Sequence, residues 1–226
     1  AGTVSISANS EIIVPTDSTL VLNHTGGLSL GATTLTLSGG GNLQSVGLDL
    51  NDADSKLLLN SITVDSVSTS ADSSGLDIDA DSTVTSLSVA NITPVAIADG
   101  SILSGAITVT AGSIKLAETG TLASNVSMSA GTFLDADNSL TVSGALTQSG
   151  NITIDVLTDK TLTYSGTAIS LGANTLTLSG GGTFSNTNAL VLNDEDSLLS
   201  LAGILTIGDV EATDNATSGK GIQVVE

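Results

Sequence analysis

Aspartates at alternate positions are the residues of this chain whose type and spacing could do chemistry. They form one triplet and three doublets, which are Asp77, Asp79 and Asp81, Asp52 with Asp54, Asp135 with Asp137, and Asp194 with Asp196. Carboxylates at positions 1, 3 and 5 resemble the opening of a calcium-binding loop. After Asp77 the resemblance ends, because Ser82 stands where such a loop has glycine and Ser88 where it has glutamate.

These aspartates have two interpretations. Aspartate commonly begins turns and stays solvated there, and this interpretation needs no ligand. If the chain stacks equivalent segments, however, acids recur about 5 Å apart and repel each other by ~1 kcal/mol in water. A bound divalent cation would relieve that repulsion. Calcium is therefore the one cofactor that the sequence raises, as the alternative to solvated turns at all nine positions.

Residues for other catalytic chemistry are scarce. The chain has one histidine, His24 in LNHTGG, with no cysteine, no arginine and four lysines, so His24 has no second histidine or cysteine as a partner. We expect His24 to be an exposed turn residue. Paired carboxylates alone can hydrolyse glycosides, but Phe133, Tyr164 and Phe184 are too few to build the aromatic platforms usual in sugar sites. The sequence predicts a protein that is not an enzyme.

The charge balance excludes two classes of partner. Twenty-three acids against four lysines give a formal net charge of −19. Nucleic acids and anionic membrane surfaces are bound by clustered cations, which this chain lacks. The sequence also contains no apolar run of transmembrane length, so we expect no membrane insertion.

The chain repeats itself at long range. SLGATTLTLSGGG at residues 29–41 returns at 170–182 with one difference, and LNDADSKLLL at 50–59 matches LNDEDSLLSL at 192–201. The offset stays between 141 and 143 residues across these and the flanking matches. We interpret 1–226 as a single domain with an internal duplication of roughly 11–67 and 158–210.

A shorter repeat lies beneath the duplication. Ten segments of the type DSTL recur between residues 17 and 196, at a mean interval of about 20 residues. The segments open stretches of period two, such as TTLTLSG, in which Leu35 and Leu37 face one way and Thr34 and Thr36 the other. This alternation predicts half-buried strands, and clusters of Gly, Ser, Asn and Asp predict turns between them. No helical period is sustained.

Many short strands at this interval predict an all-β fold, a single parallel β-solenoid (β-helix) of about 11 coils of roughly 20 residues. Each coil would lie on its neighbour and share a narrow aliphatic core. The competing folds are a β-sandwich and a β-barrel, which normally carry more hairpin signals. Asn-Gly is absent here, and Asp99-Gly100 is the one Asp-Gly.

Residues 111–154, AGSIKLAETGTLASNVSMSAGTFLDADNSLTVSGALTQSGNITI, resemble the degenerate repeats of bacterial surface β-helices. The families that they resemble are the autotransporter passengers and the filamentous-haemagglutinin-type adhesins. The resemblance implies a right-handed parallel β-helix, secretion, and a role in adhesion or surface structure. It carries over no catalytic residue.

Both termini alternate like strands, in AGTVSISANSEIIVP and in GIQVVE, and neither shows a capping helix. Such a chain is either a piece of a longer adhesin or a subunit that pairs end to end with its copies. The start at a small residue and the short length favour a complete secreted subunit.

We therefore expect a secreted or cell-surface structural protein that self-associates through its terminal coils into a filament. The alternatives are a rod segment of a large bacterial surface adhesin, and an ice- or glycan-binding solenoid with surface glycans as partners. The outward Thr pairs vary between segments, which disfavours an ice-binding face.

Overall fold

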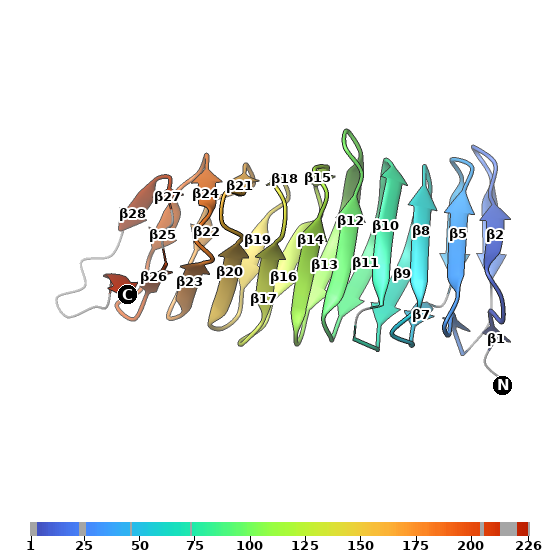
Figure 1. The fold of residues 1–226 in the computed structure, drawn as a ribbon, viewed down its shortest axis with the longest axis horizontal. Coiled ribbons are helices and arrows are strands. Elements are labelled where there is room, and N and C mark those ends of the chain that lie inside the picture. The colour runs from blue at the N-terminus through green and yellow to red at the C-terminus, as the bar shows by residue number, and fades with distance from the viewer. Residues whose placement is uncertain are drawn as a thin grey trace.

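The protein is a rod of stacked coils, as Figure 1 shows. The computed structural model describes residues 4–22, 26–45, 47–72, 74–203, 206–212 and 221–225. The described residues form strands and turns without a helix, and all ladders between named strands are parallel. The predicted fold class, an all-β parallel solenoid, is confirmed.

Each complete coil has three sides. The first side belongs to an eleven-stranded sheet, here called the front sheet because it faces the viewer in Figure 1. Its strands are β2 (Ser10–Ile13), β5 (Thr34–Ser38), β8 (Lys56–Asn60), β10 (Gly75–Ala80), β12 (Thr93–Ile97), β14 (Ser113–Ala117), β17 (Phe133–Ala136), β20 (Ile152–Val156), β23 (Thr175–Ser179), β26 (Leu198–Ala202) and β29 (Gly221–Val225).

The other two sides belong to a fifteen-stranded sheet, here called the bent sheet, and a three-stranded sheet that continues it. The bent sheet contains β1 (Val4–Ser5), β3 (Thr19–Leu22), β4 (Leu28–Ser29), β6 (Asn42–Ser45), β7 (Leu48–Leu50), β9 (Thr63–Thr69), β11 (Ser82–Val89), β13 (Ile102–Val109), β15 (Thr121–Leu122), β16 (Asn125–Met128), β18 (Leu140–Val142), β19 (Leu146–Gln148), β21 (Thr161–Tyr164), β24 (Thr183–Asn186) and β27 (Thr206–Ile207). The three-stranded sheet contains β22 (Ile169–Ser170), β25 (Leu190–Leu192) and β28 (Val210–Ala212).

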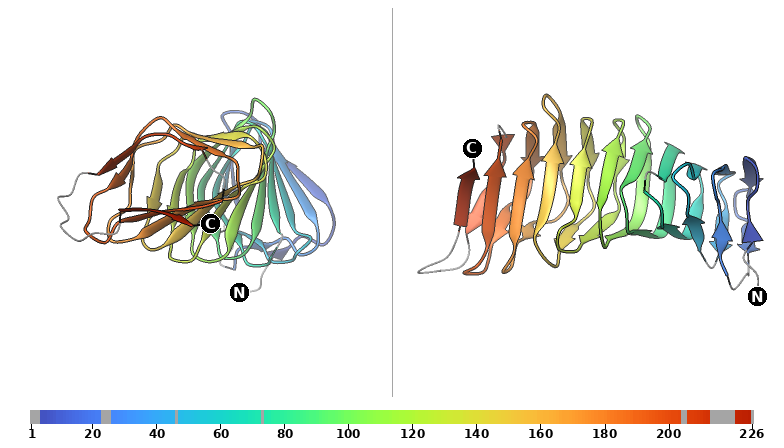
Figure 2. Two further views of the ribbon diagram at one scale, coloured as in Figure 1. Left: turned by 60° about the vertical axis from the view of Figure 1, so that its left-hand side comes forward. Right: turned by 60° about the horizontal axis from the view of Figure 1, so that its bottom comes forward.

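Two sides merge in the middle of the rod. β9 pairs through Thr63 with β6 and through Val67 with β7, so a single strand crosses the corner there. β13 likewise pairs with β15 at its start and with β16 at its end. The coils surround one interior, which Figure 2 shows obliquely along the rod.

The rod makes about ten turns, one fewer than the coils counted in the sequence. Eleven front strands are separated by ten steps, and the steps are uneven. Paired residues differ by 19 positions between Leu57 and Leu76 and by 25 between Ser10 and Leu35. Despite this variation the ladders between named strands keep their register, apart from one shift between β8 and β10 and one between β11 and β13.

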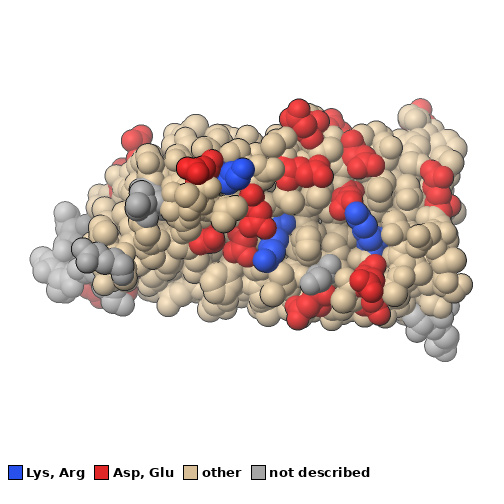
Figure 3. All heavy atoms as spheres, viewed as in Figure 1, with Lys and Arg blue, Asp and Glu red and all other residues tan. Residues whose placement is uncertain are grey.

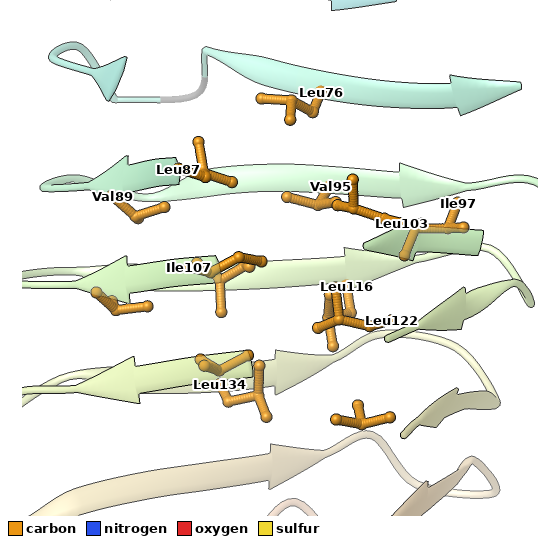
Figure 4. Packing of buried hydrophobic residues seen from close by; sticks show 14 of the residues in the cluster. Leu76, Leu87, Val89, Val95, Ile97, Leu103, Ile107, Leu116, Leu122 and Leu134 are labelled. Atoms are coloured by element: carbon orange, nitrogen blue, oxygen red, sulfur yellow. The ribbon is translucent and has the colours of Figure 1, made fainter. Parts of the chain in front are cut away.

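The core is a continuous aliphatic column. Leu35 and Leu37 are both 0% exposed, so the predicted inward side of TTLTLSG is confirmed. One line of the column runs by direct pairing from Leu35 through Leu57 and Leu76 to Val95. Figure 4 shows how side chains from opposite sheets fill the same interior, with Leu76, Val95 and Leu116 from the front sheet and Leu87, Ile107 and Leu122 from the bent sheet.

The triple glycine that ends both copies of the repeated phrase fits a close backbone approach. In the first copy a turn places the Pro15 carbonyl oxygen 2.4 Å from where a Cβ on Gly41 would lie. In the second copy the Leu157 carbonyl oxygen would lie 2.6 Å from a Cβ on Gly182. Any side chain at either position would displace this turn, which explains why the phrase returns with its glycines intact.

Two of the three aromatic residues stack in the core, whereas Phe133 is 43% exposed on the outward side of β17. Tyr164 and Phe184 are buried on adjacent coils with ring centroids 6.2 Å apart and planes inclined by 17°. The Tyr164 hydroxyl donates to the Thr167 carbonyl at 2.7 Å and accepts from the Leu146 N–H at 3.1 Å, so its burial leaves no polar group unpaired. Among the residues placed by the structure, no helix has the length and apolar character to cross a bilayer.

Candidate functional site

The aspartate doublet in LNDADS is part of a clamp on the neighbouring coil. Asp52 Oδ1 accepts a hydrogen bond from the Asp54 N–H at 3.0 Å, which closes a tight turn. Ser55 Oγ accepts from the Asp52 N–H at 3.0 Å and donates to the Gly31 carbonyl at 2.5 Å. Asn51 Oδ1 accepts from the Gly31 N–H at 2.9 Å, so both polar groups of this glycine are held by one loop.

The second copy builds the same clamp. Asp194 Oδ1 accepts from the Asp196 N–H, and Ser197 Oγ donates to the Gly172 carbonyl at 2.7 Å. Asn193 Oδ1 accepts from the Gly172 N–H at 2.8 Å. The two most similar phrases of the duplication are therefore contact partners, SLGA supplying the glycine and LNDxDS the loop that holds it. Their joint recurrence in the sequence was the signal that could have predicted this contact.

Removing the serine of a clamp should weaken the rod. Ser55 and Ser197 are each 2% exposed, so Ser55→Ala or Ser197→Ala leaves the Asp52 or Asp194 N–H without its acceptor and removes the serine's hydrogen bond to the Gly31 or Gly172 carbonyl. We expect each change to lower the free energy of unfolding by about 1–3 kcal/mol, measured by urea denaturation. Ser86→Ala, at an exposed position of β11, is the control and should cost little. An equal loss in all three variants would contradict the clamp.

The triplet Asp77, Asp79 and Asp81 does not converge on one point. Asp77 lies on the outward side of β10 and forms an ion pair with Lys56 of β8. Asp79 is exposed at the place where the register of β10 against β8 shifts. Asp81 Oδ1 accepts a hydrogen bond from the Ile102 N–H at 2.9 Å, so this carboxylate binds the backbone of the next coil.

Asp135 is the predicted ligand that does stack on another acid. It pairs in register with Asp155 of β20 on one side and with Lys115 of β14 on the other. Burial raises the pKa of the Asp135 carboxyl above its ordinary value of 3.8. The Ser113 hydroxyl and Lys115 lower this pKa, and the nearby Asp155 and Asp137 raise it further. Asp155 belongs to no pair of alternate aspartates, so the spacing did not predict it as a ligand. Figure 3 shows the acids and the few lysines scattered over this face.

The raised pKa of Asp135 gives stability a pH dependence. The ionised form is disfavoured in the fold, so this cost is present at pH 7 and disappears as pH falls through the folded pKa toward 3.8. Asp135→Asn should therefore raise the free energy of unfolding at pH 7, by less than about 1 kcal/mol because solvent screens a half-buried group. The gain should vanish near pH 4 in denaturation curves. Asp65→Asn, on β9 of the bent sheet, makes the same charge change as a control; an equal gain from it would assign the effect to net charge.

Metal binding stays a prediction. Within the described part of the chain, no three or more acidic or histidine side chains are grouped to hold a metal ion. The doublets at 52/54 and 194/196 cap turns, as the interpretation without a ligand expects. His24 lies outside the described residues.

The test of calcium binding is a thermal melt in chelator and in millimolar calcium, because a bound ion raises the melting temperature.

A shallow groove of about 650 Å³ runs across successive coils where strands of the bent sheet separate, at 123–125, 143–145 and 165–168. Its lining consists of Ala, Ser, Gly, Thr and Asn, with no charged or aromatic side chain. Ligand sites usually combine an apolar surface with a few convergent polar groups. The groove supports no particular ligand chemistry.

The two ends of the rod carry exposed apolar residues on strands with an open edge. Among the described strands, β29 pairs with β26 alone and β2 with β5 alone. Ile222 and Val224 of β29 are 56% and 71% exposed, and Val4 of β1 is 45% exposed. An open edge beside apolar side chains is the usual template for another strand.

No family model, no curated protein and no solved structure matches the chain.

Proposed function

We propose that this protein is an extracellular structural protein, without enzymatic activity, whose copies stack end to end into a filament. The observation that carries the proposal is the pair of open edges at opposite ends of one rod, β2 and β29. Because all ladders are parallel, the end of one copy presents the edge that the start of the next can pair with. Such contacts are heterologous and propagate.

The remaining surface supports a structural role. The net charge of −19 keeps the sides of neighbouring rods apart, so growth along the axis is favoured over lateral clumping. The outward side of the front sheet carries a mixed column, Phe133, Thr153, Thr177, Ser200 and Gln223. This column has two successive threonines, Thr153 and Thr177, where an ice-binding face has threonine in nearly every coil, and it lacks the aromatic rows of a glycan-binding face.

The second candidate function is a rod segment within a large surface adhesin. The same open edge of β29 favours it, because a following coil of one longer chain would cover Ile222 and Val224 equally well. In that case the coils on either side belong to one polypeptide, and the purified chain has no need to associate.

Electron microscopy of the purified chain distinguishes the two. We expect long, uniform fibres one rod wide, in about 0.15 M salt, where charges are screened beyond about 8 Å. Isolated short rods at all concentrations would contradict the filament and support the adhesin segment. Binding of a monomer to a glycan array would instead support a recognition module.

A further inference from the structure

The duplication identifies an internal counterpart for the C-terminal coil. β28 lies on β25 through Val210 and Leu190, as the end of β9 lies on β7 through Val67 and Leu48. β29 lies on β26 as β10 lies on β8, and each begins with a glycine paired to the first residue of the strand below. The C-terminal coil, represented by β28 and β29, is therefore the counterpart of the coil represented by the end of β9 and by β10.

That counterpart is covered inside the rod. Leu87 lies on Val67, Val95 lies on Leu76, and Ile97 lies on Ile78. Leu76 and Ile78 are consequently 0% and 1% exposed. Ile222 and Val224 hold the same places in the C-terminal coil but remain more than half exposed, since none of the described strands lies beyond them.

The start of the chain has the sequence character of the covering coil. VSISANSEIIV at 4–14 aligns without a gap with LSVANITPVAI at 87–97. The five inward positions keep their kind of side chain, namely Val4/Leu87, Ile6/Val89, Ser10/Thr93, Ile12/Val95 and Val14/Ile97.

The turns that follow the two segments also agree. The Ser18 N–H donates to the Pro15 carbonyl at 3.0 Å, and the Ser101 N–H donates to the Ala98 carbonyl at 2.9 Å. A coil of this shape already rests on the counterpart of the C-terminal coil inside the rod, so the same contact is available between two copies.

We propose that the N-terminal coil of a second copy, residues 4–14, seats on the C-terminal coil in one register, with Val4 over Val210, Ile12 over Ile222 and Val14 over Val224. This register rests on the end-to-end assembly proposed above. It extends the front sheet by β2 on β29 and the adjoining side by β1 on β28. The contact repeats the pairing of Leu87 with Val67 and of Val95 with Leu76.

A disulfide between outward residues tests the register. In the proposed pairing Ile13 lies over Gln223, as Ala96 lies over Asp77 inside the rod. Both positions are exposed, and the chain has no cysteine of its own. Neighbouring Cα atoms in register are about 4.8 Å apart, within the range of a disulfide. Ile13→Cys with Gln223→Cys should therefore give a ladder of reducible oligomers under mild oxidant. The two positions lie at opposite ends of the rod, so a crosslink joins two molecules.

The matched control moves one cysteine by two residues along β2. Glu11→Cys with Gln223→Cys places the Cα atoms roughly 8 Å apart, beyond disulfide reach. Three results would overturn the register and still leave end-to-end assembly in place. They are a ladder from the control alone, equal ladders from both variants, and no ladder from either variant while fibres form. If microscopy shows no fibres from the unmodified chain, the proposed function fails and the register fails with it.

Discussion

Val224→Lys is expected to abolish filaments while leaving the single rod folded. Val224 is 71% exposed in one copy, so a lysine there is solvated and should not change the melting temperature of the rod. In the filament the same side chain lies under Val14 of the next copy, where an unpaired ammonium costs about 3–5 kcal/mol. The critical concentration for assembly should therefore rise by a factor of about 150 to 4,000, measured by sedimentation and light scattering.

The control for this variant is Leu157→Lys. Leu157 is 48% exposed and lies between β20 and β21, away from both ends of the rod. It introduces the same charge on a comparable aliphatic surface and should leave the critical concentration within a few-fold of the unmodified chain. If Val224→Lys assembles at the concentration of the unmodified chain, the contact between copies does not involve the front edge of the C-terminal coil.

Gly105→Ala should give the largest loss of stability. Gly105 lies in β13, with φ of 120°, where the register between β11 and β13 shifts. A Cβ there would lie 1.8 Å from the Val84 carbonyl oxygen, so the backbone of one coil must move away from the next. We expect a loss of about 4 kcal/mol or more, the range of substitutions that force the backbone to shift.

Gly100→Ala tests the strain of a positive φ where no backbone atom lies close to the new methyl group. Gly100 also has a positive φ, 77°, but nothing lies within 4 Å of the Cβ position. Alanine there should cost only the backbone strain, about 1–2 kcal/mol. The difference between the two variants, from urea denaturation of each, measures the close approach together with the greater strain of alanine at a φ of 120°. Equal losses would show that strain alone accounts for Gly105.

The strands and the core follow from the sequence because they depend on local order. The alternation around Leu35 and Leu37 needs only the two-residue period of a strand to predict which side chains are buried. Parallel stacking then follows from the scarcity of hairpin signals. The same reasoning overestimated the turns slightly, because it took a mean interval and the true steps run from 19 to 25 residues.

The contacts between coils could not be predicted in the same way. Which acid lies over which residue depends on the length of each corner turn, and these lengths are uneven. Asp135 therefore meets Asp155, whereas Asp77 lies between Leu58 and Ala96 and pairs with Lys56. The clamp on Gly31 is the exception that was open to prediction, since its two parts recur together at a nearly constant offset.

The uneven coils give the rod a mechanical signature. The hydrogen bonds between coils run along the long axis, so a pulling force applied to the two ends loads one layer at a time. Coils should then detach one at a time at low force. Each detached coil of 19–25 residues releases about 65–90 Å of extended chain. The extension steps recorded in such a pull should therefore group by coil length, and the 25-residue coil between Ser10 and Leu35 should give the longest step.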